Sequence, residues 1–230
     1  MRHYVKKTSP FLLCILALLF MDGCRKDFSA TAEHKASYGW EMYERKDYLK
    51  SKEWFTNSVL TNEKWKDGYN GLGWSSAKLL ELDSLDTENI GSIRTFHRGL
   101  IQPKDPWNST DVHLEILAGL TFAYHAKGNY SEAVKFGSAL IDSTLESLTP
   151  PRWHSWAFSH DSTLNYLDLR ITMASSYFAL AKFDSTHKHL KVILDSLDSP
   201  SLLISDYSTL IGRQKVAQQL DSLQKVLLQK

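Results

Sequence analysis

The sequence is poor in cysteine, in helix-breaking residues and in long apolar runs. Only Cys14 and Cys24 occur among 230 residues, which leaves little scope for disulfides. Glycine and proline are sparse after Cys24, and no segment alternates Val, Ile and Thr as long β-strands do. Beyond the N-terminal segment, no stretch approaches the roughly 20 apolar residues that a membrane-spanning helix needs. These shortages favour an all-helical chain.

The sequence also lacks a marked excess of charge of either sign. The formal net charge is +1, and removal of residues 1–23 leaves 24 basic and 25 acidic side chains. Such a balance gives no electrostatic footprint for nucleic acid and no polybasic patch for a membrane surface. We therefore do not expect nucleic acid as a partner.

The N-terminal segment has the pattern of an export signal. Its basic start, with Arg2, Lys6 and Lys7, precedes the apolar run Phe11–Phe20. That run is shorter than the roughly 20 residues of a membrane-spanning helix and has the length of a signal-peptide core. The pattern predicts a signal peptide at residues 1–23.

The signal ends at Met21-Asp22-Gly23-Cys24, which resembles the lipobox of bacterial lipoproteins. In that family the chain is cut before the cysteine, whose thiol and new amino group carry acyl chains such as palmitate. Gly23 and Cys24 match the pattern, whereas Asp22 departs from the usual small or apolar residue. The resemblance implies lipidation of Cys24, and Arg25 in place of an aspartate favours the outer membrane. The alternative is a secreted protein that is cut nearby and keeps a free Cys24.

A helix–turn–helix pattern recurs along the rest of the chain. Small residues occupy one position at intervals of 34, 48 and 53 residues: Gly39, Gly73, Thr121 and Ala174. Small residues also occupy the position where the two helices of a hairpin should touch: Ser51, Ser92, Ala133 and Thr186. Stacked hairpins require small residues at such close approaches.

This pattern resembles the tetratricopeptide repeat (TPR), a helical hairpin with a period near 34. The resemblance implies an all-α fold, a right-handed superhelical array of hairpins with a C-terminal capping helix. After a tether at 24–31, the helical domain is expected to cover 32–230. The expected repeats lie at about 32–65, 66–105, 114–147 and 167–200, and the capping helix at 206–229. The alternative is a generic helical bundle, because amphipathic helices alone produce much of the pattern.

Three insertions separate the expected helices, at 82–90, 102–112 and about 143–166. The last contains the Trp153–Asp161 loop, which combines two Trp, two His and an Asp. Functional residues concentrate on long loops, so an envelope enzyme built on this loop is one hypothesis. No carboxylate pair, nucleophile elbow or metal-ligand spacing occurs in it. We therefore favour a structural role, in which Trp153, Trp156 and Phe158 cover the gap between the third and fourth repeats.

Two further motifs predict no site. The glycine-rich segment 71–76 lacks the third glycine and the preceding strand of a dinucleotide-binding fingerprint. His187 and His189 are two residues apart in an expected helix and point in different directions, whereas zinc-binding helices space histidines by four. We expect no catalytic residue, metal or cofactor.

In TPR families the first helix of each hairpin lines a concave groove through its positions two, five, nine, twelve and thirteen. Aromatic side chains are frequent at such binding surfaces. The resemblance therefore implies a partner-binding groove that contains Trp40, Tyr43, Trp74, Phe122, His125 and Phe178. The alternative is that these aromatics pack on the N-terminal segment or on the inserted loops.

The leading hypothesis is a lipid-anchored envelope protein, not an enzyme, that serves as a protein–protein interaction scaffold. Its partner would be a protein or peptide of the cell envelope, on the periplasmic side or at the surface. The second hypothesis is a receptor for a small ligand or glycan that uses the aromatic face.

Overall fold

Helices make up most of the chain in the computed structural model, which describes residues 29–82, 91–104, 111–146, 156–204 and 206–229. The chain divides into Met1–Ala30 and Thr31–Lys230, and the described helices belong to the second unit. The expected signal peptide, Cys24 and most of the tether lie outside the described residues. None of the described helices combines the length and apolarity needed to cross a membrane.

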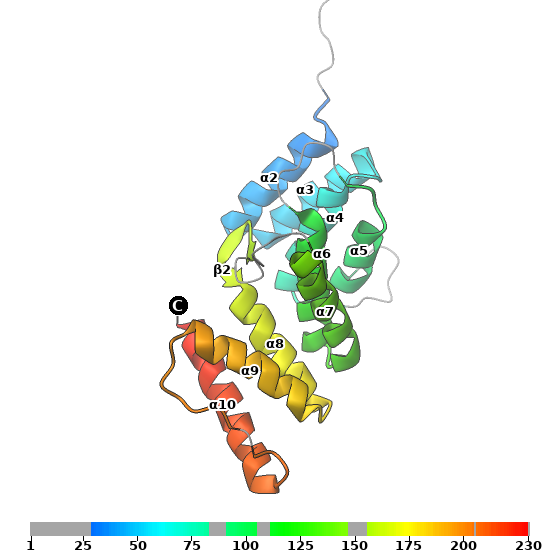
Figure 1. The fold of residues 1–230 in the computed structure, drawn as a ribbon. Helices are drawn as coiled ribbons and strands as arrows, with labels where there is room; N and C mark the ends of the chain where they lie inside the picture. The colour runs from blue at the N-terminus through cyan, green and yellow to red at the C-terminus, as the bar shows by residue number, and fades with distance from the viewer. Residues whose placement is uncertain (1–28, 83–90, 105–110, 147–155, 205, 230) are drawn as a thin grey trace, which may run out of the picture. The chain divides into compact units, whose positions relative to one another are not determined.

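The helices follow one another as pairs, in agreement with an all-α fold (Figure 1). Each expected repeat contains one pair, although α6 and α8 begin slightly ahead of the expected starts. The pairs are α2 (Ala32–Glu44) with α3 (Tyr48–Thr61), α4 (Lys66–Lys78) with α5 (Ser92–Leu100), α6 (Val112–Ala126) with α7 (Tyr130–Glu146), and α8 (Tyr166–Ala179) with α9 (Phe183–Ser196). A last helix, α10, spans Leu210–Leu228 and begins after the expected residue 206, because the Thr209 hydroxyl caps it by accepting from the Gly212 N–H.

The same turn closes the first helix of every pair. One residue of each turn has a left-handed backbone, and these residues are Lys46, Leu80, Gly128 and Ala181. In the first turn, the Lys46 N–H bonds the Tyr43 carbonyl and the Asp47 N–H bonds the Met42 carbonyl. The other three turns repeat this double bond, which satisfies the last carbonyls of a helix. Each left-handed residue lies seven positions after an aligned small residue, which confirms the register of the sequence alignment.

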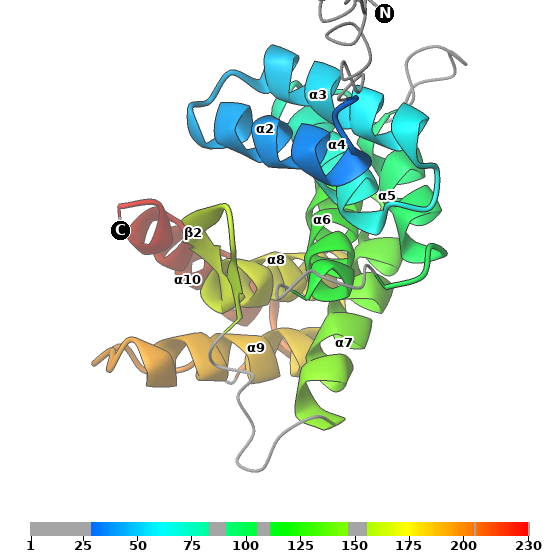
Figure 2. The same cartoon turned by 90° about the horizontal axis from the view of Figure 1, so that it is seen from above.

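The helices form two layers. The first helices of successive pairs, α2, α4, α6 and α8, pack side by side, and α10 continues this series against α8 (Figure 2). The second helices, α3, α5, α7 and α9, each pack against the first helix of their own pair. Each of α3, α5 and α7 also packs against the first helix of the following pair. The packing is therefore consecutive and repeat-like.

Phenylalanine rings fill the space between pairs where glycines leave room. A methyl group on Gly39 would come within 2.8 Å of the Phe55 ring, and one on Gly71 would overlap the same ring from the next pair. Phe96 lies in the same way against Gly73 of its own pair and Gly119 of the following one. Both rings are fully buried. The glycine-rich segment 71–76 is thus a packing element inside α4.

The small residues that were predicted to lie between paired helices are all fully buried, which confirms that prediction. These residues are Ser51, Ser92, Ala133 and Thr186. The Ser51 hydroxyl donates to the Gly39 carbonyl at 2.9 Å, and the Thr186 hydroxyl lies 3.4 Å from the Ala174 carbonyl. The same side-chain position thus bridges the two helices in the first and fourth pairs.

One element was not predicted. Within the long insertion, β1 (Ala157–Phe158) and β2 (Asp161–Asn165) form an antiparallel hairpin in which Phe158 pairs with Asp161. We call residues 156–165 the inserted hairpin. Asn165 ends it and begins α8: its side chain accepts from the Leu167 N–H, while Asp168 accepts from the Asn165 N–H. This reciprocal capping fixes where the hairpin stops and the helix starts.

Candidate functional site

Four of the six predicted groove residues lie together on the layer of first helices. Trp40 and Tyr43 come from α2, Trp74 from α4 and Phe122 from α6. Trp40 and Tyr43 contact edge-to-face at 5.6 Å between ring centroids, and Phe122 lies 6.2 Å from Trp74. We call these four side chains the aromatic groove. Their role in binding a partner stays a prediction.

The inserted hairpin occupies this groove. The Phe158 ring stacks on Trp74 at 4.4 Å between centroids and meets Trp40 and Tyr43 edge-on at 5.9 Å each. Phe158 is 1% exposed and Trp74 is 4% exposed. Figure 1 shows the hairpin beside the end of α2. Trp74 therefore packs beneath an inserted loop in this structure, which is the alternative given above for the groove residues.

The predicted role of the insertion is wrong for Phe158. We expected it to cover the gap between the third and fourth repeats, but it packs on helices of the first and second pairs. The reason is that the aromatic rings of α2 and α4 would otherwise face solvent. Packing Phe158 on these rings removes their apolar surface from water, which is favourable. Trp156 is also buried, and Trp153 lies outside the described residues.

A buried carboxylate holds the backbone of the hairpin. Glu115 of α6 is 2% exposed, and its Oε1 accepts from both the Ser159 N–H, at 3.0 Å, and the Ser159 hydroxyl, at 2.6 Å. Its Oε2 accepts from the Asn70 amide at 2.6 Å. Charge-assisted hydrogen bonds of this kind are about twice as strong as neutral ones. Glu115 thus selects a residue that offers a hydroxyl beside its backbone N–H.

Three further contacts hold the rim of the hairpin. The His160 ring stacks on Trp40 at 3.6 Å with the planes 5° apart, and its Nδ1 lies 3.1 Å from Glu44 Oε1. Asp161 lies 3.8 Å from the Lys78 ammonium. Each of residues 158 to 161 is therefore contacted by its own group on α2, α4 or α6. This is how a protein groove holds an extended peptide.

Sequence analysis missed Glu115, although the repeat contains a signal for it. An acidic residue stands six positions before each aligned small residue, at Glu33, Asp67, Glu115 and Asp168. This is position two of the repeat, which faces the groove in TPR families. Asp67 accepts from the Trp40 indole N–H at 2.9 Å, and Glu115 holds Ser159. The acidic position therefore supplies polar partners to the groove and to its occupant.

Three buried polar atoms around the groove have no hydrogen-bond partner in the described structure: the Tyr43 hydroxyl, the Trp74 Nε1 and the Asn70 Oδ1. Buried polar groups are normally paired. Burial raises the pKa of Tyr43, and the nearby Tyr48, Asp161 and Glu115 raise it further. The phenol is therefore neutral and can both donate and accept. The hairpin satisfies the apolar surface of the groove but not all of its polar groups.

The other two predicted groove residues do not join this site. The His125 Nδ1 lies 2.8 Å from the Ser176 hydroxyl of α8, and burial lowers the pKa of this imidazole. Phe178 packs edge-on against Phe183 at 5.5 Å, within the C-terminal apolar core. His125 and Phe178, which occupy position twelve of the third and fourth repeats, therefore contribute to helix packing.

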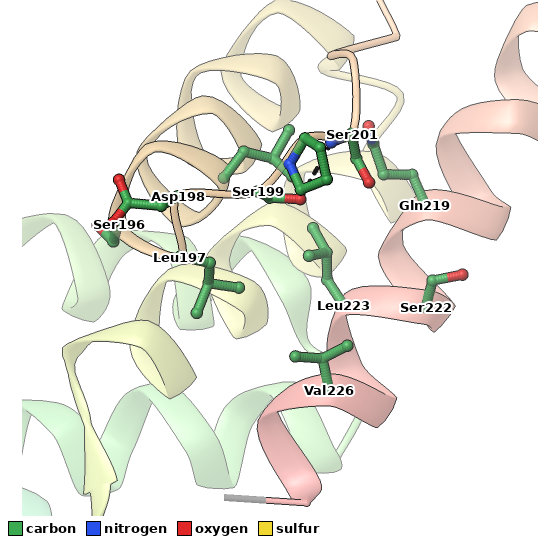
Figure 3. A pocket seen from close by; sticks show the side chains of 11 residues that line it. Ser196, Leu197, Asp198, Ser199, Ser201, Gln219, Ser222, Leu223 and Val226 are labelled. Atoms are coloured by element: carbon green, nitrogen blue, oxygen red, sulfur yellow. Dashed lines mark hydrogen bonds between the residues drawn. The ribbon is translucent and has the colours of Figure 1, made fainter.

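A cavity of about 550 Å³ lies between the end of α9, the chain that follows it, and α10 (Figure 3). Leu197, Leu223 and Val226 form its apolar wall, while serines and Gln219 line the rest. The Gln219 amide donates to the Leu202 carbonyl at 3.0 Å, and its oxygen is buried without a partner among the described residues. None of the predicted site residues lines this cavity.

Within the part of the chain that the structure describes, no cluster of three or more His, Cys, Asp or Glu could hold a metal ion. No protein-family model matches the chain, and no curated protein matches it.

Proposed function

We propose that this chain is a lipid-anchored envelope protein whose TPR-like superhelical array binds an extended segment of a partner protein. The observation that supports this most is the aromatic groove closing on Phe158. Three rings from two helices, α2 and α4, surround one aromatic side chain of a short strand, and a buried carboxylate of α6 bonds the next residue. A surface that holds a strand segment by an aromatic anchor and by its backbone has the chemistry of peptide binding.

The proposed anchor rests on the sequence. Gly23-Cys24 after a short apolar run supports acylation of Cys24, and the outer membrane is the proposed location. Several acyl chains on one residue give stable membrane attachment, whereas a single chain does not. A tethered scaffold needs no catalytic residues, and aromatic packing and hydrogen bonds in the groove support binding.

Site-specific photo-crosslinking in the envelope of the native host tests the scaffold. A crosslinking amino acid at position 44 lies on the groove rim, where the Glu44 side chain is 57% exposed beside His160. The control position is 225 on α10, where the Lys225 side chain is 68% exposed. We expect a discrete protein adduct from position 44 that position 225 does not give. Absence of an adduct from position 44, or the same adducts from both positions, would contradict the proposal.

Fractionation tests the anchor separately. The unmutated chain should enter the membrane fraction and incorporate labelled fatty acid, and Cys24→Ser should abolish both. An N-terminal peptide without an acyl group, identified by mass spectrometry of the unmutated chain, would rule out the lipoprotein assignment while leaving the groove proposal untouched.

A further inference from the structure

The inserted hairpin is held in the aromatic groove in the manner of a ligand. It belongs to the insertion between α7 and α8, whereas the ring contacts of Phe158 and the side-chain partner of Ser159 lie on α2, α4 and α6. Phe158 supplies the anchor and Ser159 supplies a hydroxyl and an N–H. We infer that this segment is an internal ligand, and that the groove binds a partner peptide in which an aromatic residue precedes a serine or threonine.

The carboxylate of Glu115 decides the second residue of this motif. It accepts two bonds from Ser159 through one oxygen, while Asn70 occupies the other. Alanine in place of the serine would keep the N–H bond to Glu115 but lose the hydroxyl bond to the same buried oxygen, which weakens binding. A threonine offers the same hydroxyl, and an acidic residue would be repelled. Glu115 is therefore the specificity-determining residue, and the aromatic rings determine the preceding one.

The unpaired polar atoms show that the hairpin is an imperfect occupant. Trp74 Nε1 is a donor, Asn70 Oδ1 is an acceptor and the Tyr43 hydroxyl is both, and all three are buried beside the segment without a partner among the described residues. An extended peptide offers backbone N–H and C=O groups in alternation. A partner peptide can therefore pair groups that the hairpin leaves unsatisfied, and so compete with a segment that is covalently attached.

Because the hairpin is covalently attached, it competes strongly with a partner peptide for the groove. This competition regulates partner binding. A segment tethered within the same chain competes at an effective concentration on the order of millimolar. The apparent affinity for a partner peptide falls by the fraction of molecules whose groove is open. The groove therefore selects against weak ligands, and this inference rests on the proposed function because it names the ligand of the same site.

A trans-binding experiment tests the inference on the full chain purified in detergent. The variant Phe158→Ala/Ser159→Ala removes the internal anchor, and the probe is a fluorescent synthetic peptide with the sequence of residues 156–165. We expect the probe to bind the double variant at least about tenfold more tightly than the unmutated chain, because the internal competitor has been weakened. A probe with Phe replaced by Ala should bind about thirtyfold more weakly or worse.

The role of Glu115 is tested by a double-mutant cycle. Replacing Ser by Ala in the probe should weaken binding about tenfold to the double variant, and this difference should shrink when Glu115→Gln replaces the charge-assisted bond with a neutral one. A merely structural role for Glu115 would lower both affinities equally. Far-ultraviolet circular dichroism checks that each variant keeps its helices. Ser159→Ala alone, which retains the aromatic anchor, replaces the double variant if that protein unfolds, and it should bind the probe with intermediate affinity.

Two results would overturn the inference. One is a helical, folded variant that does not bind the probe at about millimolar concentration, or that binds the Phe→Ala probe equally well. The other is a concentration-dependent dimer of the unmutated chain that the double variant does not form, which would make a second copy the occupant. Either result is distinguishable from failure of the proposed function, because crosslinking at position 44 reports on the natural partner without the probe.

Discussion

The first three helix pairs and the C-terminal helices use the same turns but cover their inner layer in different ways. Over α2, α4 and α6 the cover is the inserted hairpin, which contributes Phe158 to an aromatic groove. Over α8 the cover is α10, which buries Val216, Leu220 and Leu223 in an aliphatic core. One cover is a short strand segment, and the other is a helix of 19 residues.

This difference follows from the residues between the helices. In the first pairs, phenylalanine rings of the second helices lie on glycines of the first helices. At α7 and α8 the relation is reversed, because a side chain on Gly137 would meet Met173 of the next pair. In α8 and α9, Leu190 and Ile193 pack with α10 residues in one aliphatic core. We therefore predict that the C-terminal framework needs its cover, whereas the N-terminal framework can release its own.

The largest expected effect compares two equally buried phenylalanines. Phe96→Ala removes a ring from between the helix pairs and should lower the free energy of unfolding by about 3–5 kcal/mol. Phe158→Ala should cost clearly less, because the hairpin can detach while the helices stay folded. Urea denaturation, followed by far-ultraviolet circular dichroism, measures both free energies of unfolding. Equal losses from the two substitutions would show that the hairpin is an integral part of the core.

The next effect concerns the glycines of α4. Gly71→Ala would drive a methyl group into the Phe55 ring and should cost about 1–3 kcal/mol through overpacking. Gly68→Ala is the matched control in the same helix, where the nearest atoms are 3.1 Å away and belong to the Ser58 and Val59 side chains. That control should be nearly neutral, since alanine also favours the helix by up to about 1 kcal/mol. A neutral Gly71→Ala would contradict the proposed packing of Phe55.

A further effect is a pH dependence that belongs to the C-terminal region. Burial, and secondarily Arg170, lower the pKa of His189 from 6.5 to about 3. The unfolded chain therefore binds a proton below about pH 6.5 that the folded chain refuses until about pH 3, so stability falls as the pH drops through this window. His189→Gln should flatten that decline, whereas His187→Gln in the same helix should not. Urea midpoints at about pH 7 and pH 4.5 measure it, and parallel declines for both variants would contradict the assignment.

The regular spacing of small residues made the helix pairs predictable. The hairpin has no such spacing, so it was not predicted. The aligned small residues gave the correct register because a close helix approach tolerates few side chains, whatever surrounds it. The left-handed turns were less visible, since only Gly128 of the four is a glycine and Lys46, Leu80 and Ala181 carry side chains there. Three of these turns are thus imposed by the packing of the helices and not by residue preference.

The groove was predictable only in part, for a related reason. Position nine gathered Trp40, Trp74 and Phe122 because it repeats with the helices. Phe158 lies more than 80 positions from Trp74 in the chain and in no repeat, so no local pattern connects them. An acidic residue occurs at position two in all four repeats, and this recurrence is a sequence signal that includes Glu115.

Native-state hydrogen exchange of the Ser159 amide tests the central claim most directly. This N–H bonds the buried Glu115 carboxylate, so it exchanges only when the hairpin leaves the groove. We predict that it exchanges through a local opening, with a free energy well below that of the buried amides of α4, and that the opening is insensitive to low denaturant. Exchange of Ser159 and the α4 amides at one common free energy, through global unfolding, would contradict the claim that the groove holds a releasable internal ligand.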